Sequence, residues 1–185
     1  MNLRKTIFLA MMTSIAIVLS VVESMISSTL FLIPGVKLGL SNIVTIVILY
    51  RYSWKEASVV VVIRILLAAL ISPVATLVSF ALSASGGIVA LLTMVFIQKT
   101  KIFSILGVSV AGSLMHMVGQ LLLAMVLLDT PTLIYYLPYM LLLSVPTGIV
   151  TGLASKTIIH SFLGHQEPPR FEKKEQESSC PTNIR

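Results

Sequence analysis

The stretch VVVVIRILLAAL (residues 59–70) places one arginine, Arg64, among aliphatic side chains only. Similar apolar runs recur along the chain, which is 56% hydrophobic and 11% charged over 185 residues. Because an ordinary soluble domain is about 25% charged, this chain has too few charged side chains to cover a soluble surface. The sequence therefore predicts an integral membrane protein and excludes the ordinary soluble-enzyme classes.

The apolar runs are long enough for membrane-spanning helices, which need about 20 apolar residues each. We predict an all-α integral membrane protein, a six-transmembrane-helix bundle that forms one domain over residues 1–163. The last span is expected to be interrupted by Pro138 and Pro146. The six predicted spans cover residues 6–25, 36–52, 55–72, 74–97, 104–128 and 132–163.

The basic residues predict the orientation of the bundle. With both termini in the cytoplasm, the cytoplasmic segments hold 11 of the 13 lysines and arginines, and Asp129 lies outside. The net charge of +6 is scattered, so it indicates topology and no nucleic-acid partner. Residues 164–185 are rich in Pro, Glu and Lys, and we expect a disordered cytoplasmic tail there.

Several polar residues lie within or near the predicted spans, where a charge costs about 2.5–3.5 kcal/mol on insertion scales. Arg64 is too deep to reach either membrane face easily, so it is expected to point into the bundle. Two compatible interpretations remain open: a structural ion pair with Glu23, and part of a site for an anionic or strongly polar ligand. The candidate substrate-binding residues, which converge on the outer half of the membrane, are Glu23, Lys37, Asn42, Arg64, His116 and Gln120.

The other candidates also have structural interpretations. Lys37, taken alone, fits a lysine whose side chain reaches the membrane interface. Asn42 fits one partner of an interhelical hydrogen bond, which contributes about 0.6 kcal/mol on average. His116 and Gln120 share a helix face because they are four residues apart, and His116 fits a satisfied bundle histidine. Small residues at a spacing of four predict close-packing faces, namely Ala16, Ser20 and Ser24 in the first span and Ser144, Gly148 and Gly152 in the last.

Catalytic and metal-binding patterns are missing from the sequence. It contains no phosphate-binding loop of the GxxxxGK[ST] type. Asp129 is the only aspartate, so no carboxylate cluster is expected to hold Mg²⁺. No second histidine or carboxylate has metal-ligand spacing to His116. We therefore expect no metal, no cofactor and no enzymatic activity.

The chain contains the four segments SVVESMI (20–26), PGVKLGLSNIVTIVILY (34–50), FSILGVSVAGSLMHMVGQL (103–121) and YYLP…TGIVTGL (135–153). Together they resemble the Gx transporter family, which is also labelled heptaprenyl diphosphate synthase component I. That family is similar to the S components of energy-coupling factor transporters, small six-helix proteins with a solute cavity on the outer side. S components pair with a membrane coupling subunit and two cytoplasmic ATPases. The resemblance implies that the six candidate residues occupy the family's characteristic polar positions.

The leading hypothesis is a substrate-binding subunit of the bacterial plasma membrane that takes up a small polar or anionic solute. The solute would be a vitamin or an isoprenoid or quinone precursor, and separate ATPases would supply the energy. The alternative is an accessory or scaffold membrane protein in menaquinone, prenyl diphosphate or flavin-linked electron-transfer metabolism. A membrane enzyme acting on a prenyl lipid ranks last, because His116 is a possible acid or base but no metal site or carboxylate pair accompanies it.

Overall fold

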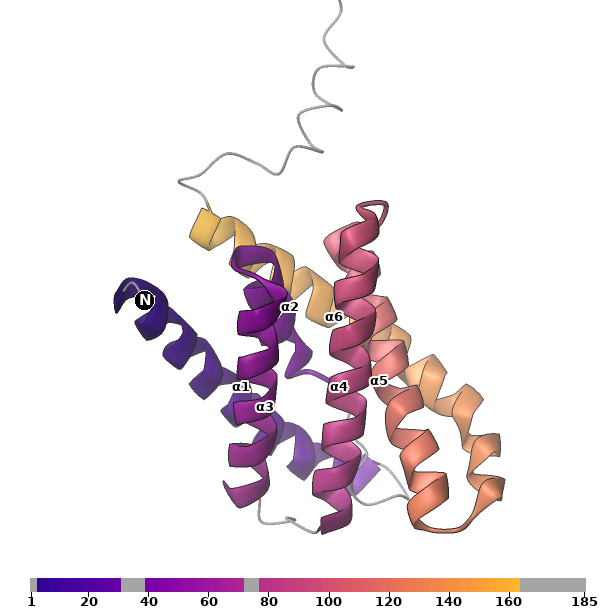
Figure 1. Cartoon of the computed structure of the whole chain (residues 1–185). Helices are drawn as coiled ribbons and strands as arrows, with labels where there is room; N and C mark the ends of the chain where they lie inside the picture. The colour runs from indigo at the N-terminus through magenta and orange to yellow at the C-terminus, as the bar shows by residue number, and fades with distance from the viewer. Residues whose placement is uncertain (1–2, 31–38, 72–76, 164–185) are drawn as a thin grey trace, which may run out of the picture.

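The computed structural model describes residues 3–30, 39–71 and 77–163, and no β-strand occurs among them (Figure 1). The predicted tail at 164–185 and the candidate residue Lys37 lie outside the described residues, so those expectations stay predictions. The elements are α1 (Leu3–Leu30), α2 (Asn42–Arg51), α3 (Trp54–Ile71), α4 (Leu77–Thr100), α5 (Ile105–Leu127), the 3₁₀ helix η1 (Pro131–Tyr136) and α6 (Leu137–Leu163).

Four helical segments in the described part of the chain are long and apolar enough to cross a membrane. They are Leu3–Ile26, Leu77–Thr100, Ile105–Leu127 and Pro131–Ser161. The protein is therefore an all-helical, multi-pass membrane protein, as the composition predicted. Helix α3 is shorter and carries three charged side chains, those of Lys55, Glu56 and Arg64.

The second predicted span, 36–52, is wrong in length. Helix α2 contains only ten residues, about 15 Å at 1.5 Å per residue, which is half of a hydrocarbon core of about 30 Å. Gly39 has a φ of 88°, in the left-handed region that a right-handed helix does not contain. The helix can therefore begin only after Gly39, and the residues at its amino end, Ser41 and Asn42, are buried in the bundle.

The last predicted span, 132–163, changes from the 3₁₀ helix η1 to α6 just before Pro138, but it has no interruption at Pro146, where one was expected. Helix α6 begins at Leu137, and Pro138 occupies its first turn, where a missing N–H leaves no bond unmade. The helix also continues through Pro146. Hydroxyl groups beside that proline bond to nearby carbonyls, with Ser144 Oγ 2.9 Å from the oxygen of Leu141.

The predicted close-packing faces are confirmed. Ala16, Ser20 and Ser24 are all buried along α1. A Cβ added to Gly148 would lie 2.8 Å from the Cα of Val110, so α6 and α5 touch nearly backbone to backbone. Helix α5 thus packs between α4 and α6, while α1 packs on α2 and α3.

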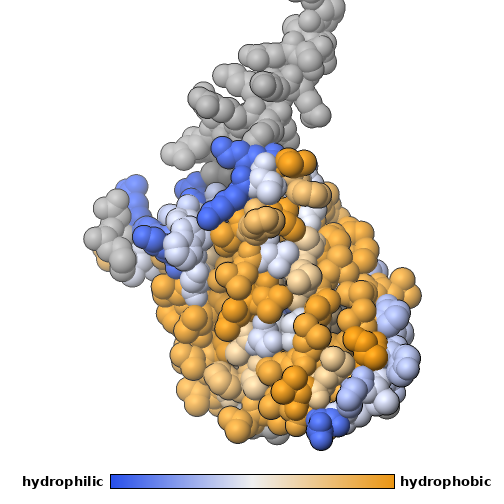
Figure 2. Space-filling view, turned by 45° about the vertical axis from the view of Figure 1, so that its right-hand side comes forward, coloured by the Kyte–Doolittle hydropathy of each residue, from blue (hydrophilic) through white to orange (hydrophobic). Residues whose placement is uncertain are grey.

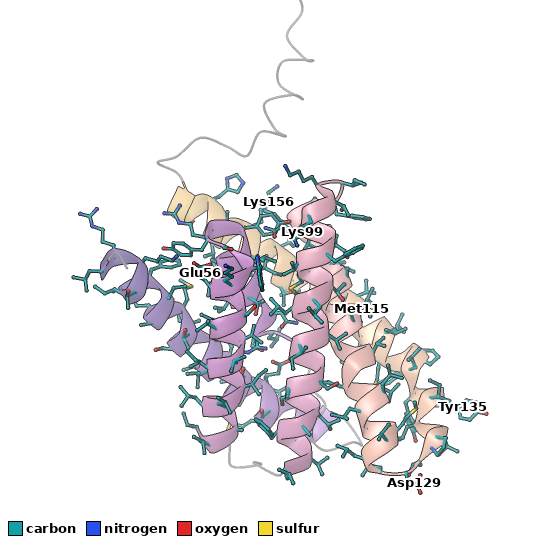
Figure 3. All side chains as sticks on the ribbon, viewed as in Figure 1. Glu56, Lys99, Met115, Asp129, Tyr135 and Lys156 are labelled. Carbon is teal, nitrogen blue, oxygen red and sulfur yellow. The ribbon has the colours of Figure 1, made fainter. Side chains whose placement is uncertain are left out.

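The outer surface of the bundle is apolar, as a lipid-facing surface must be (Figure 2). Large side chains such as Leu77, Leu70 and Val126 are among the most exposed in the protein. Charged groups gather at the ends: Lys99, Lys156 and Glu56 lie near one end, and Asp129 lies at the other (Figure 3). The charge asymmetry predicted from the sequence is therefore present along the axis of the bundle.

Candidate functional site

Five of the six predicted site residues are buried in the interior, although charged and amide side chains are seldom fully buried. They come from four helices and lie in the carboxyl-terminal half of α1, at the amino end of α2 and in the middle part of α3 and α5. We call these five residues the polar cluster. Its members, with exposed fractions of at most 3%, are Glu23, Asn42, Arg64, His116 and Gln120.

Glycines bring the members of the polar cluster together. A Cβ on Gly39 would lie 2.9 Å from Asn42 Nδ2 and 3.7 Å from His116 Cδ2. On α4, a Cβ on Gly86 would lie 3.0 Å from His116 Nε2, and one on Gly87 would lie 3.3 Å from Arg64 Nη2. Because Gly86 and Gly87 are adjacent, His116 and Arg64 approach α4 at neighbouring positions.

Glu23 holds the amino end of α2. Its Oε1 accepts hydrogen bonds from the backbone N–H groups of Gly39 and Leu40, the latter at 3.1 Å. Its Oε2 lies 3.5 Å from the hydroxyl of Ser41. A helix amino end carries a partial positive charge and free N–H groups, so a carboxylate is stabilised there. The carboxylate of Glu23 is therefore already engaged by the protein.

His116 and Gln120 form a pair along α5, as their spacing predicted. Gln120 Nε2 and His116 Nε2 are 3.1 Å apart. The hydroxyl of Ser85 donates to the carbonyl oxygen of Gly119 at 2.6 Å and joins α4 to this part of α5. The His116–Gln120 pair thus lies beside a hydrogen-bonded contact between α4 and α5.

Two donors of the polar cluster are buried without a hydrogen-bond partner among the described residues: Arg64 Nη1 and Asn42 Nδ2. Leaving a buried donor unsatisfied costs about 1–3 kcal/mol, and more for a charged group. No direct salt bridge joins Arg64 to Glu23 within the part of the chain that the structure describes, although the two charges interact electrostatically. The N–H groups on Nη1 of Arg64 are therefore available to donate to a bound molecule.

Sequence reasoning missed the backbone and glycine contributions to this site. The N–H groups of Gly39 and Leu40 carry no side-chain signal, and the left-handed Gly39 marks their position only in three dimensions. The pair Gly86–Gly87 inside a predicted span was visible, because consecutive glycines in a helix indicate close approach. Ser113, one turn before His116, was not selected, yet its hydroxyl is fully buried without a partner among the described residues.

The donor set does not favour a metal ion. Among the described residues, no three His, Cys, Asp or Glu side chains lie together in a way that could hold one. The cluster offers one carboxylate, which the start of α2 already binds. What it presents to a ligand is mainly N–H donors.

A family model described as heptaprenyl diphosphate synthase component I matches residues 12–158 of this chain. The match begins at residue 12, within α1, and extends to residue 158, near the end of α6, so it includes every member of the polar cluster. No curated protein and no solved structure matches the chain.

Proposed function

The chain belongs to the heptaprenyl diphosphate synthase component I family, and on that premise we propose that it is a membrane-embedded substrate-binding subunit. It takes up a small polar or anionic solute, a vitamin or an isoprenoid or quinone precursor. Its role is binding, without catalysis, and separate ATPases supply the energy.

The observation that carries this proposal is the pair of unsatisfied donors in the polar cluster, Arg64 Nη1 and Asn42 Nδ2. Polar and ionisable groups inside a membrane are expensive and usually serve a substrate path or site. A structural role would leave these donors bonded to the protein. A ligand with acceptor atoms gives them the partners that the described residues do not.

The proposed topology has six crossings in a bacterial plasma membrane, with both termini in the cytoplasm. In this topology α2 is the inner half of the second crossing, and the charged end near Lys99 and Lys156 faces the cytoplasm. The positive-inside rule supports this orientation. The partners are a membrane coupling subunit and cytoplasmic ATPases, as in the energy-coupling factor transporters that the sequence resembles.

A binding assay on the purified protein tests the site. We expect Arg64→Ala and His116→Ala each to weaken binding of the solute that co-purifies with the protein. Arg51→Ala is the matched control, because Arg51 is exposed at the other end of α2. If both cluster variants bind the solute as tightly as the control does, the assignment of the site is wrong.

The family description favours one second candidate, an accessory or scaffold membrane protein in prenyl diphosphate, menaquinone or flavin-linked electron-transfer metabolism. That role predicts stable co-purification with such enzymes and no bound solute. Native mass spectrometry of the protein from its host separates the two, because it detects partners and solutes in one spectrum.

A further inference from the structure

The connection between α4 and α5 exposes every side chain from Lys99 to Ser104, and we call these residues the α4–α5 turn. Figure 1 shows this turn at the same end of the bundle as the carboxyl end of α6. Two of its side chains are large and apolar: Ile102 is 80% exposed and Phe103 is 56% exposed. Because removing apolar surface from water is favourable, this apolar pair is a surface that a partner can cover.

The backbone on both sides holds the apolar pair outside the bundle. Helix α4 ends at Thr100, and Lys101 has a φ of 56°, in the left-handed region that residues other than glycine seldom adopt. The hydroxyl of Ser104 then accepts a hydrogen bond from the N–H of Gly107 at 3.3 Å and caps the start of α5. The apolar pair thus lies between two defined helix ends.

The charge beside the apolar pair is positive. Lys99 and Lys101 are both exposed, and the α4–α5 turn contains no acidic residue. Within the described ranges, the acid at this end of the bundle is Glu56, which is bonded to Lys5 at 2.5 Å (Figure 3). Lysines near the carboxyl end of a helix also stabilise the helix dipole, but that role does not require exposed apolar neighbours. The turn therefore fits a partner that is both anionic and apolar.

The outward surface of α4 leads to this turn. Ile88, Leu92 and Phe96 are each more than half exposed, and they follow one another at a spacing of four, along one side of the helix. One further step of four residues reaches Thr100, within the turn. Lysines next to exposed Phe and Ile side chains are typical of segments at the border between lipid headgroups and acyl chains. The continuity with this apolar stripe favours lipid over a protein partner.

We propose that the α4–α5 turn binds an anionic phospholipid of the surrounding membrane. Lys99 and Lys101 contact the phosphate of the headgroup, while Ile102 and Phe103 lie among the acyl chains. This surface is separate from the polar cluster, and the inference does not depend on the proposed solute-binding function.

Lipid binding to the detergent-purified full chain tests the headgroup contact. Native mass spectrometry at a series of concentrations of dioleoyl phosphatidylglycerol or dioleoyl phosphatidylcholine gives the affinity for each lipid. We expect tighter binding of the anionic lipid, and we expect Lys99→Gln combined with Lys101→Gln to weaken it at least about fivefold. Arg4→Gln combined with Arg51→Gln is the matched control, because it removes two exposed charges outside the turn. Equal losses in the two double variants, or equal affinities for the two lipids, overturn the inference.

Fluorescence in vesicles tests the position of the apolar pair. Trp54 is the only tryptophan in the sequence, so Phe103→Trp combined with Trp54→Phe leaves one emitting indole, at the turn. In vesicles of phosphatidylglycerol and phosphatidylcholine, we expect lipids brominated on their acyl chains to quench this emission strongly and aqueous acrylamide to quench it weakly. Strong quenching by acrylamide with no effect of the brominated lipids would place the turn in water, leave the apolar pair to a protein partner and overturn the inference.

Discussion

Two groups of buried polar side chains in this bundle differ in whether their hydrogen-bonding atoms have partners within the described residues. The first is the polar cluster. The second, which we call the hydroxyl seam, lies between α5 and α6 and consists of Ser109, Thr151 and Ser155, all fully buried. Ser109 Oγ lies 2.8 Å from the carbonyl oxygen of Gly148 and 2.7 Å from Thr151 Oγ1. Ser155 Oγ donates to the carbonyl oxygen of Thr151 at 2.7 Å.

Every hydroxyl of the seam thus has a partner inside the protein, whereas Arg64 and Asn42 of the polar cluster each keep a buried donor without one among the described residues. Satisfied polar groups hold helices together. Unsatisfied ones lower stability and persist for another reason. Under the proposed function, hydrogen-bond satisfaction distinguishes the polar cluster from the hydroxyl seam better than burial or polarity does. Changes in the seam should therefore affect stability, and changes in the cluster should affect binding.

The largest expected effect follows from Arg64→Gln. Truncating one partner of a buried, hydrogen-bonded charge costs about 2–5 kcal/mol of binding, so affinity for the co-purifying solute should fall at least about 30-fold. The thermal stability of the solute-free protein should fall little, because Arg64 makes no salt bridge among the described residues and Glu23 stays bonded to the start of α2. A large loss of stability in the solute-free protein, with binding intact, would make Arg64 structural and erase the contrast with the seam.

The second-largest effect is expected for Gly148→Ala, at the contact between α5 and α6 beside the hydroxyl seam. In Gly148→Ala the new Cβ would lie 2.8 Å from the backbone of Val110, so α6 must move away from α5. Overpacking of this kind costs about 1–3 kcal/mol of unfolding free energy. Gly107→Ala is the control, because its nearest neighbour is the exposed, movable side chain of Phe103. Equal unfolding midpoints for the two variants would mean that this contact is loose.

Glu23→Gln tests the anchor of α2. The neutral amide accepts the N–H groups of Gly39 and Leu40 more weakly, because bonds to charged groups are about twice as strong. We expect the free energy of unfolding to fall by about 1 kcal/mol and hydrogen exchange at those two amides to become faster. Glu56→Gln, at the start of α3, serves as the control. Unchanged exchange at Leu40 in Glu23→Gln would show that the carboxylate does not hold the helix start.

The smallest effect is expected from Ser109→Ala in the seam. Interhelical hydrogen bonds in membranes contribute about 0.6 kcal/mol on average, so unfolding free energy should fall by about that amount with solute affinity unchanged. Ser58→Ala removes a hydroxyl that bonds only within its own exposed helix turn and controls for the substitution itself. A change in solute affinity on Ser109→Ala would extend the binding site into the seam.

The sequence predicts much of this fold because apolar length and charge are local properties. The runs around Arg64 and His116 identify α3 and α5, and the polar side chains within them identify the candidate residues. The short length of α2 could not be predicted, because the amino acids around Gly39 do not indicate that its φ is positive. Ser109 and Asn42 are both polar residues within predicted apolar spans, so the sequence does not distinguish their roles. Only the packing of the helices gives Ser109 Oγ its hydrogen-bond partners and leaves Asn42 Nδ2 without one among the described residues.

Native mass spectrometry of the protein purified from its host, run in parallel on the wild type and on Arg64→Gln, tests the central claim most directly. The account predicts a small solute bound to the wild-type chain and absent from the variant, with both chains folded. A wild-type chain without any bound solute, or a solute retained equally by the variant, would contradict it.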